Sequence, residues 1–172
     1  VYARKEENGP LVNGNSNVPP LSHFTRPGKL FSGGGGLVST VPDYLRFAQM
    51  LLNGGKIDGQ RVLKSETVAA MVSQQTSDDQ GSVYWYAPGQ FTSVTGWMWG
   101  LSIGVRPDSA GEEVPGRPGE VGWSGLANTF FMVNLREKLV AVIMAQYVGP
   151  GGNDMSAVFR DSVYAAINDS AD

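Results

Sequence analysis

The sequence of 172 residues contains no cysteine, a single histidine and no apolar run near the length of a membrane span. Without cysteine there is no disulfide, thiolate metal site or cysteine nucleophile, and one histidine argues against a histidine-rich zinc site. A helix needs about 20 apolar residues to cross a bilayer, so we expect no membrane span. Thirteen basic residues stand against sixteen acidic ones, for a net charge of −3 and no basic block. We therefore expect no nucleic-acid partner, because phosphates attract a stripe of Lys and Arg.

The composition that is present describes a folded domain, with 41% hydrophobic and 17% charged residues. Twenty-three glycines and ten prolines favour many turns and short strands over a helical bundle. The length suits one domain with a substantial core. Residues 1–31 show no apolar period, so we expect an irregular lead-in that packs on a part missing from this chain, followed by an ordered unit over 32–172. The chain starts at Val1 rather than Met, which we expect of a fragment or a processed chain. The sequence does not indicate a compartment.

The apolar spacing predicts an α+β fold in which an antiparallel sheet is flanked by helices. Thr40 suits the N-cap of a helix over about 42–53, and Asp58-Gly59 suits the turn of a short hairpin. Ser65 is expected to cap a second helix over about 66–73. The remaining segments follow the periods of strands at about 83–86, 97–105, 120–124, 129–134 and 139–146, and of a closing helix at about 155–167.

Four polar features invite chemical interpretations that the residues support only partly. Gly33–Gly36 lacks the Lys-Ser/Thr of a phosphate-binding loop, so we interpret it as backbone that passes close to something or adopts positive φ. His23 has no evident carboxylate partner and no Gly-x-Ser-x-Gly elbow, which favours a surface or loop histidine. The pairs Asp78-Asp79 and Glu112-Glu113 are interpreted as solvated loop charge rather than as the carboxylates of a glycosidase.

Aromatic residues gather in one third of the sequence, either as core or as a wall that faces a ligand: Tyr84, Trp85, Tyr86, Phe91, Trp97, Trp99 and Trp123. The most informative segment is 120–129, a strand ending in Trp123-Ser124-Gly125 that is followed at once by another strand. Such an end leaves small residues and free backbone amides. It either forms only a tight turn or also offers those amides to an oxyanion.

Residues 32–55 (SGGGGLVSTVPDYLRFAQMLLNGG) combine a glycine-rich approach with a helix, and residues 122–131 (GWSGLANTFF) place Trp-Ser-Gly at the end of a strand. These stretches resemble the β-lactamase-related serine hydrolases, which include class C β-lactamases, DD-peptidases and esterases of the same fold. The second stretch looks like the third active-site motif of that superfamily, on an edge strand beside the nucleophile. Penicillin-binding members carry Lys-Thr-Gly or His-x-Gly there. The esterase branch often carries Trp-x-Gly, which Trp123-Ser124-Gly125 matches. The resemblance spans roughly 32–167.

The resemblance implies acyl transfer through a serine acyl-enzyme and no metal or organic cofactor. It assigns the backbone N–H of Leu126 to the oxyanion hole, with Trp123, Ser124 and Gly125 beside the carbonyl. Candidates for the substrate-binding wall on the acyl side are Trp97, Trp99 and the loop at 106–119.

The sequence departs from the superfamily where the nucleophile should be. No Ser is followed three residues later by Lys, and no Tyr-x-Asn occurs. Both motifs belong to the N-terminal half of the superfamily domain, so the chain looks like a C-terminal half that is inactive alone. The expected partner is an N-terminal half that carries Ser-x-x-Lys and the Tyr motif, and the expected substrate is a small ester or amide.

Several alternatives stay open at the level of sequence. On the same fold, the enzyme could be a β-lactamase, a DD-peptidase or an acyltransferase. Trp123 in place of Lys argues against strong penicillin chemistry, because it supplies no cation for the carboxylate of the drug, and promiscuous lactam cleavage stays open. Outside this fold, the chain could be a non-catalytic, aromatic-rich binding module. A pseudo-enzyme whose partner half has lost Ser-x-x-Lys is a further alternative.

Overall fold

The computed structural model describes residues 2–4, 6, 8–13, 37–77, 84–87, 90–93, 96–149 and 154–168. Its helices are α1 (Val41–Leu52), α2 (Ser65–Met71) and α3 (Asp154–Asn168). Its strands are β1 (Tyr2–Ala3), β2 (Val12–Asn13), β3 (Lys56–Ile57), β4 (Gln60–Arg61), β5 (Tyr84–Ala87), β6 (Gln90–Ser93), β7 (Met98–Trp99), β8 (Gly104–Val105), β9 (Glu120–Ser124), β10 (Phe130–Asn134), β11 (Leu139–Ile143) and β12 (Tyr147–Val148). The predictions on His23, Gly33–Gly36 and Asp78-Asp79 lie outside the described residues.

A five-stranded antiparallel sheet forms the centre of the fold, with strand order β11-β10-β9-β8-β7. Consecutive strands are neighbours throughout, so the sheet is a meander. Strand β10 is paired along its whole length, since Phe130 to Asn134 lie opposite Ser124 to Glu120 on one side and Ile143 to Leu139 on the other. All five residues of β10 are buried. The predicted antiparallel meander is confirmed.

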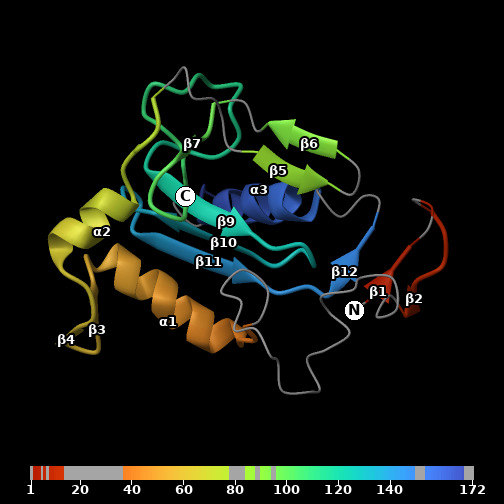
Figure 1. Ribbon diagram of the computed structural model, residues 1–172, viewed down its shortest axis with the longest axis horizontal. Coiled ribbons are helices and arrows are strands. Elements are labelled where there is room, and N and C mark those ends of the chain that lie inside the picture. Colours follow the sequence, from red (N-terminus) through yellow and green to blue (C-terminus); the bar gives the residue numbers. More distant parts are fainter. Residues whose placement is uncertain are drawn as a thin grey trace.

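Helices cover both faces of this sheet (Figure 1). On one face, Ala48 and Leu51 of α1 and Val68 of α2 pack with Phe131 and Val133 of β10. On the other face, residues of α3, among them Tyr164 and Phe159, pack with residues of β10 and β11, among them Phe130 and Met132. The alternation of β10 side chains between two apolar layers explains why its sequence is a continuous apolar run. In the described part of the chain, no helix has the length and apolar character needed to cross a bilayer.

Helix α1 begins where the sequence predicts. Thr40 is the N-cap, and its Oγ1 accepts a hydrogen bond from the Asp43 N–H at 3.3 Å while donating to the Asp43 carboxylate at 2.8 Å. The helix ends before Gly54-Gly55, and Gly55 has φ 92°. A side chain at Gly55 would place its Cβ 2.2 Å from the Leu63 carbonyl oxygen, so only glycine fits this close crossing.

The structure differs from the sequence prediction at three places. Lys64 rather than Ser65 is the N-cap of α2, and it provides no side-chain cap bond. The predicted strand at 97–105 is a hairpin of β7 and β8, because its middle meets the end of α2. There the Leu101 N–H donates to the Met71 carbonyl at 3.1 Å, and a Cβ on Gly100 would lie 2.0 Å from that oxygen. The predicted strand at 139–146 ends at Ile143, and β12 follows it separately.

Strands β1 and β2 lie within the predicted lead-in, where β1 pairs in parallel with β12 and antiparallel with β2. The boundary near residue 31 stays a prediction, because residues 14–36 lie outside the described part of the chain.

Candidate functional site

The candidate site lies where β9 ends and the chain turns towards β10. The Gly125 N–H donates to the Thr129 carbonyl at 2.7 Å, and the Asn128 N–H donates to the Gly125 carbonyl at 2.9 Å, which closes a four-residue turn. Asn128 has φ 62°, a left-handed conformation that asparagine tolerates. Its Nδ2 donates to the Tyr147 carbonyl at 2.8 Å, and the Tyr147 N–H donates to the Ala127 carbonyl at 3.1 Å. Two hydrogen bonds thus fix the turn to β12.

Leu126 presents an uncommitted backbone donor at this turn. Among the hydrogen bonds of the described residues, none uses the Leu126 N–H, and the residue is 44% exposed. Leu126 is the second residue of the turn, a position whose N–H takes no part in the hydrogen bond that closes a β-turn. A Cβ on Gly125 would lie 2.4 Å from Thr129 Oγ1, so glycine permits the close pairing just before Leu126. A bare amide on a fixed turn is the kind of group that stabilises an oxyanion.

Strand β9 is not an edge strand, which corrects the expectation from the resemblance. β8 lies against its first half, where Gly104 and Val105 pair with Gly122 and Val121. The pairing stops there, so Trp123 and Ser124 extend beyond β8 and are half-buried. Trp-Ser-Gly at the end of β9 therefore lies beyond the register with β8, although the strand itself is central.

Two of the three predicted tryptophans lie together. The rings of Trp99 and Trp123 have centroids 4.6 Å apart with an angle of 41° between their planes, and both residues are half-buried. Trp97 is 2% exposed, packs on Val114, and donates its Nε1–H to the Pro115 carbonyl at 2.9 Å. Trp99 and Trp123 thus form a surface beside the end of β9, while Trp97 supports the loop at 106–119 from beneath.

A buried arginine organises that loop. The Arg106 N–H donates to the Glu120 carbonyl at 2.9 Å, and the guanidinium, itself buried, donates through Nη2 to the Gly111 carbonyl at 2.9 Å. Glu112 and Glu113 are exposed in the same loop. The described residues contain no group of three or more His, Asp or Glu side chains that could hold a metal ion.

Residues 2–165 match the sequence profile of the family described as Beta-lactamase. The chain belongs to the β-lactamase family. The resemblance inferred from residues 32–55 and 122–131 is confirmed, and with it membership of the β-lactamase-related serine hydrolase superfamily.

Two curated relatives come from Mycobacterium tuberculosis: the uncharacterized protein MT1414 of strain CDC 1551 / Oshkosh and protein Rv1367c of strain H37Rv. Each is 33% identical over 138 residues, which make up 75% of this chain and 31% of the relative. The chain therefore spans about a third of the length of the curated relatives it matches.

Among solved structures, the LovD6 mutant of simvastatin synthase (LovD) from Aspergillus terreus has a TM-score of 0.67 and 17% sequence identity with this chain. The match covers 98% of this chain and 42% of that one. At this identity the likeness concerns the fold, and it confirms the predicted α+β class with an antiparallel, β-lactamase-like sheet.

The opposite end of β9 carries a buried polar network that sequence analysis missed. Glu120 is fully buried; its Oε1 accepts from Arg160 Nε at 2.7 Å and its Oε2 from the Tyr164 hydroxyl at 2.9 Å. Asn134 Nδ2 donates to the same hydroxyl at 3.0 Å. Burial raises the pKa of Tyr164 above its usual value, and the Glu120 carboxylate raises this pKa further. Glu120 and Arg160 are 40 residues apart in sequence, so no local pattern signals their pairing.

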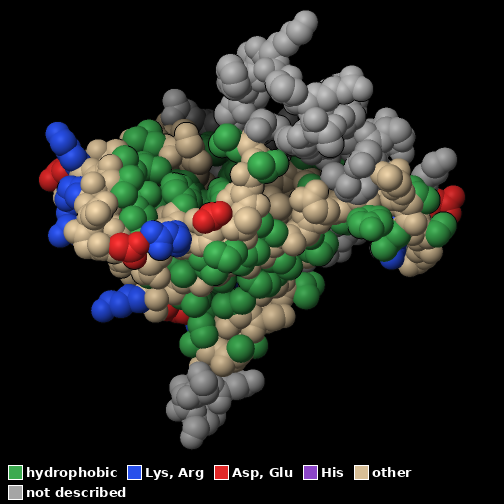
Figure 2. Space-filling model, turned by 90° about the horizontal axis from the view of Figure 1, so that it is seen from below, with side chains coloured by type: hydrophobic (Ala, Val, Ile, Leu, Met, Phe, Trp, Pro, Cys, Tyr) green, Lys and Arg blue, Asp and Glu red, His purple; other side chains and the backbone are tan. Residues whose placement is uncertain are grey.

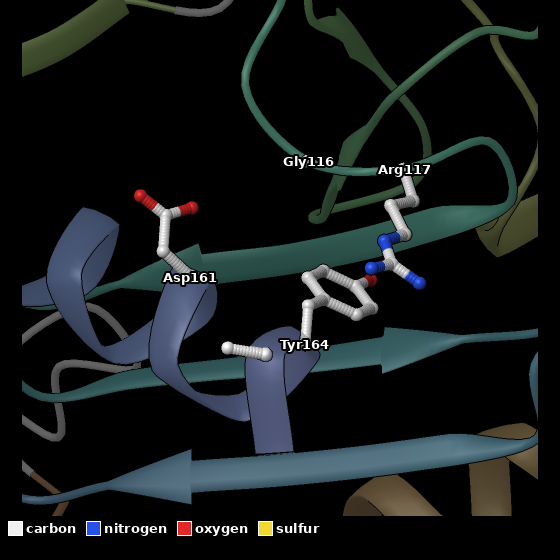
Figure 3. A pocket seen from close by; sticks show the side chains of 5 residues that line it. Gly116, Arg117, Asp161 and Tyr164 are labelled. Atoms are coloured by element: carbon white, nitrogen blue, oxygen red, sulfur yellow. The ribbon is translucent and has the colours of Figure 1, made fainter. Parts of the chain in front are cut away.

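A cavity of about 330 Å³ lies beside α3 and is lined by Gly116, Arg117, Asp161, Tyr164 and Ala165 (Figure 3). The Arg117 guanidinium lies over the Tyr164 ring at 4.2 Å and pairs with the Glu137 carboxylate at 3.1 Å. In Figure 3 the Asp161 carboxylate lies apart from this guanidinium. Because no residue of the turn at 125–128 lines the cavity, we place the candidate site at the end of β9 and not here.

Proposed function

We propose that this chain is the C-terminal part of a serine hydrolase that cleaves small carboxylic esters, or amides, through an acyl-enzyme. The observation that carries the proposal is the uncommitted N–H of Leu126 on a fixed turn, directly after Trp123-Ser124-Gly125. Family membership supports the chemistry, because β-lactamase-like proteins include hydrolases and acyltransferases that act through serine.

In the proposed reaction, a serine hydroxyl supplied by a partner segment attacks the substrate carbonyl, and a neighbouring base takes its proton. The carbonyl oxygen becomes an oxyanion that accepts a hydrogen bond from the Leu126 N–H. The C–O bond to the leaving alcohol then breaks, the alcohol receives the proton, and an acyl-enzyme remains. Water adds to the acyl carbonyl in a second, equivalent cycle and releases the acid. One such backbone donor contributes about 3 kcal/mol to the stabilisation of the transition state.

The partner segment is an N-terminal half that carries Ser-x-x-Lys and the Tyr motif. Two facts support this part of the proposal: neither motif occurs in the 172 residues, and the chain spans 31% of its curated relatives. On this proposal the chain alone is inactive.

The substrate preference rests on Trp123. A penicillin-type substrate carries a carboxylate, and an aromatic ring at position 123 offers it no cation. The paired rings of Trp99 and Trp123 instead offer an apolar surface of the kind that receives an acyl or alcohol group. Esters without a charge beside the carbonyl therefore fit better than lactams, and the proposal puts Ser124 and Gly125 beside that carbonyl.

The test uses the full-length product of the gene and two variants of Leu126. Leu126→Pro removes the N–H at a turn position where proline is favoured, whereas Leu126→Ala keeps the N–H and removes the same side chain. With short-chain nitrophenyl esters, Leu126→Pro is expected to lower kcat by about 100- to 1,000-fold, because an oxyanion donor is lost. Leu126→Ala should keep most of the activity. Equal activities of the two variants would contradict the assigned role of this amide.

A second measurement separates the competing functions. A fluorophosphonate probe should add once to the partner segment and leave residues 1–172 unmodified, as read by intact-mass spectrometry after cleavage between the segments. Faster turnover of a chromogenic cephalosporin than of nitrophenyl esters would favour a β-lactamase. The absence of any adduct, together with a change in Trp fluorescence on adding a sugar or peptide, would favour a binding module.

A further inference from the structure

The turn that carries Leu126 is the tip of a β-hairpin with a three-residue loop, 126–128. At its base the Gly125 N–H donates to the Thr129 carbonyl at 2.7 Å, and the Asn128 N–H donates to the Gly125 carbonyl at 2.9 Å. Asn128, the last residue of the loop, has φ 62°. Hairpin loops of this length commonly end on a residue in the left-handed conformation, which glycine adopts without strain. For the backbone of the loop alone, glycine at position 128 would serve at least as well.

The side chain of Asn128 makes a hydrogen bond that glycine cannot make. Its Nδ2 donates to the Tyr147 carbonyl at 2.8 Å, and the Tyr147 N–H donates to the Ala127 carbonyl at 3.1 Å. Both bonds belong to one residue of β12, and they reach the last two residues of the loop. The asparagine thus adds a second bond between the loop and β12 to the one that the backbone provides.

The tip extends beyond the paired part of the central sheet. β9 and β10 pair as far as Ser124 opposite Phe130, and β8 pairs with β9 no further than Gly122. Among the described strands, only β12 shares hydrogen bonds with residues 126–128. Apart from the two bonds that close the loop, the tip therefore depends on β12 for its position.

β12 is itself held along its other edge. β1 pairs with β12 in parallel, with Tyr2 opposite Tyr147, and the two strands lie side by side in Figure 1. The Tyr2 N–H donates to the Gln146 carbonyl at 2.7 Å. Backbone groups of successive residues in a strand point to opposite edges, so Gln146 bonds to β1 while Tyr147 bonds to the tip. Asn128 therefore binds a strand that is fixed on its far side.

This side-chain bond matters because the Leu126 N–H lies inside the loop. Leu126 stands between Gly125, at the base of the loop, and Ala127, whose carbonyl bonds to β12. If the Asn128 side chain is removed, the loop keeps one bond to β12 and is held less firmly. A displacement of about 1 Å at a catalytic group can lower the rate by about 100-fold. The direction of the Leu126 N–H is thus sensitive to a side chain two residues away.

We propose that Asn128 is a positioning residue for the hydrolysis, because its side-chain bond to β12 sets the direction of the Leu126 N–H. The inference rests on the role that the proposed function gives to this N–H. Asn128 acts through the loop and contacts neither the substrate nor the reacting atoms. Its loss should therefore lower the rate of the chemical step more than it weakens the binding of the substrate.

The first experiment compares two variants of Asn128 with the parent in the full-length gene product. Asn128→Gly keeps the positive φ and removes the donor. Asn128→Asp keeps the size of the side chain and turns a carboxylate oxygen towards the Tyr147 carbonyl. With short-chain nitrophenyl esters, each variant is expected to lower kcat by about 10-fold or more and to change KM by less than about 3-fold. Circular dichroism of each variant controls for folding.

The full-length product is used because residues 1–172 alone leave apolar surface uncovered. Figure 2, seen from the side of α1, shows a broad band of hydrophobic side chains across this face of the molecule. Within α1, Val41 is 36% exposed and Phe47 is 37% exposed. Exposed apolar patches promote association, which would obscure a comparison of rates.

The second experiment separates positioning from a general structural effect. In a Leu126→Pro background the N–H is absent, so Asn128→Gly should lower kcat by less than about 2-fold further. A substitution that only destabilises the protein would lower kcat by the same factor in both backgrounds. Hydrogen exchange gives a readout that is independent of turnover. The Tyr147 N–H, which is bonded to Ala127, should exchange about 10-fold faster in Asn128→Gly than in the parent.

Several results would overturn the inference. These are a kcat of Asn128→Gly equal to that of the parent, a loss confined to KM, equal losses with and without the Leu126 N–H, and an unchanged exchange rate at Tyr147. A failure of the proposed function looks different. In that case Leu126→Pro and Leu126→Ala are equally active, or no fluorophosphonate adduct forms, and the role of Asn128 falls with it.

Discussion

The contacts of Glu120, the buried carboxylate at the start of β9, set how much unfolding free energy the protein loses when this charge is removed. Glu120 accepts three hydrogen bonds, from Arg160 Nε at 2.7 Å, the Tyr164 hydroxyl at 2.9 Å and the Arg117 backbone N–H at 3.2 Å. Glu120→Gln keeps the volume of the side chain but replaces one oxygen by an NH₂ group. In either orientation of the amide, that NH₂ faces at least one donor, since donors lie at both oxygens.

The expected cost is about 3 to 5 kcal/mol of unfolding free energy. An orphaned buried donor costs about 1 to 3 kcal/mol, and the unpaired Arg160 charge adds the rest. Arg160 is 6% exposed, so water cannot replace the carboxylate. Its guanidinium lies 5.4 Å from the Trp97 ring and 5.1 Å from the Phe130 ring, contacts that offset only part of the loss.

Urea unfolding of the chain, followed by circular dichroism, measures this cost in a double-mutant cycle with Arg160→Met. Removing both charges avoids the buried unpaired ion, so the double variant should be more stable than the sum of the single effects by about 2 kcal/mol or more. Glu137→Gln is the control, because Glu137 pairs with Arg117 at a position one-third exposed. That variant should cost less than about 1 kcal/mol. A loss below about 1 kcal/mol for Glu120→Gln, or additive single effects, would refute the reasoning.

Two further predictions concern stability. Tyr164→Phe should change how the unfolding free energy depends on pH in the alkaline range. Because burial raises the pKa of Tyr164, the folded state holds the hydroxyl proton more tightly than the unfolded state does. The resulting stabilisation is complete below pH 10 and is lost as pH rises through the folded-state pKa. The difference in unfolding free energy between the parent chain and Tyr164→Phe should therefore shrink above pH 10, by up to about 1.4 kcal/mol per pH unit in urea unfolding. A difference that stays constant from pH 8 to 11 would contradict this. Gly55→Ala should be at least about 2 kcal/mol less stable than Gly54→Ala by thermal unfolding. Both glycines have positive φ, but only at Gly55 does the new Cβ meet another atom, the Leu63 carbonyl oxygen at 2.2 Å. Equal losses for these two glycine variants would mean that the backbone crossing at Gly55 relaxes.

The features that the sequence predicts well are those with local causes. Helix α1 follows from Thr40, Asp43 and the apolar spacing within twelve residues, and it is found within one residue of the predicted bounds. The break between β7 and β8 has a distant cause, because Gly100 must pass the end of α2 at Met71. No periodicity within 97–105 contains that information.

The sequence names candidate residues for the site, but their arrangement depends on contacts between distant segments. Trp97 and Trp99 would share one face of a continuous strand, since side chains alternate along it. In the structure β7 begins after Trp97, so one ring is buried under the loop and the other pairs with Trp123. The turn that presents Leu126 depends on Tyr147, nineteen residues beyond Asn128, and is likewise invisible to a local pattern.

Glu120 starts β9 and Leu126 follows its end, and contacts hold the chain at both places. At one end the strand is held by the buried pair with Arg160, and along its length by β10. At the other end the turn is held to β12 through Ala127 and Asn128. On the proposed function, the sheet orients the Leu126 N–H before the substrate binds, and a preorganised donor needs no reorganisation as charge develops. Leu126→Pro, which removes this N–H, should therefore lower kcat and leave KM nearly unchanged. The reason is that the ground-state carbonyl gains little from a donor placed for the oxyanion. If Leu126→Pro instead raises KM and leaves kcat unchanged, the turn binds the substrate without stabilising the transition state.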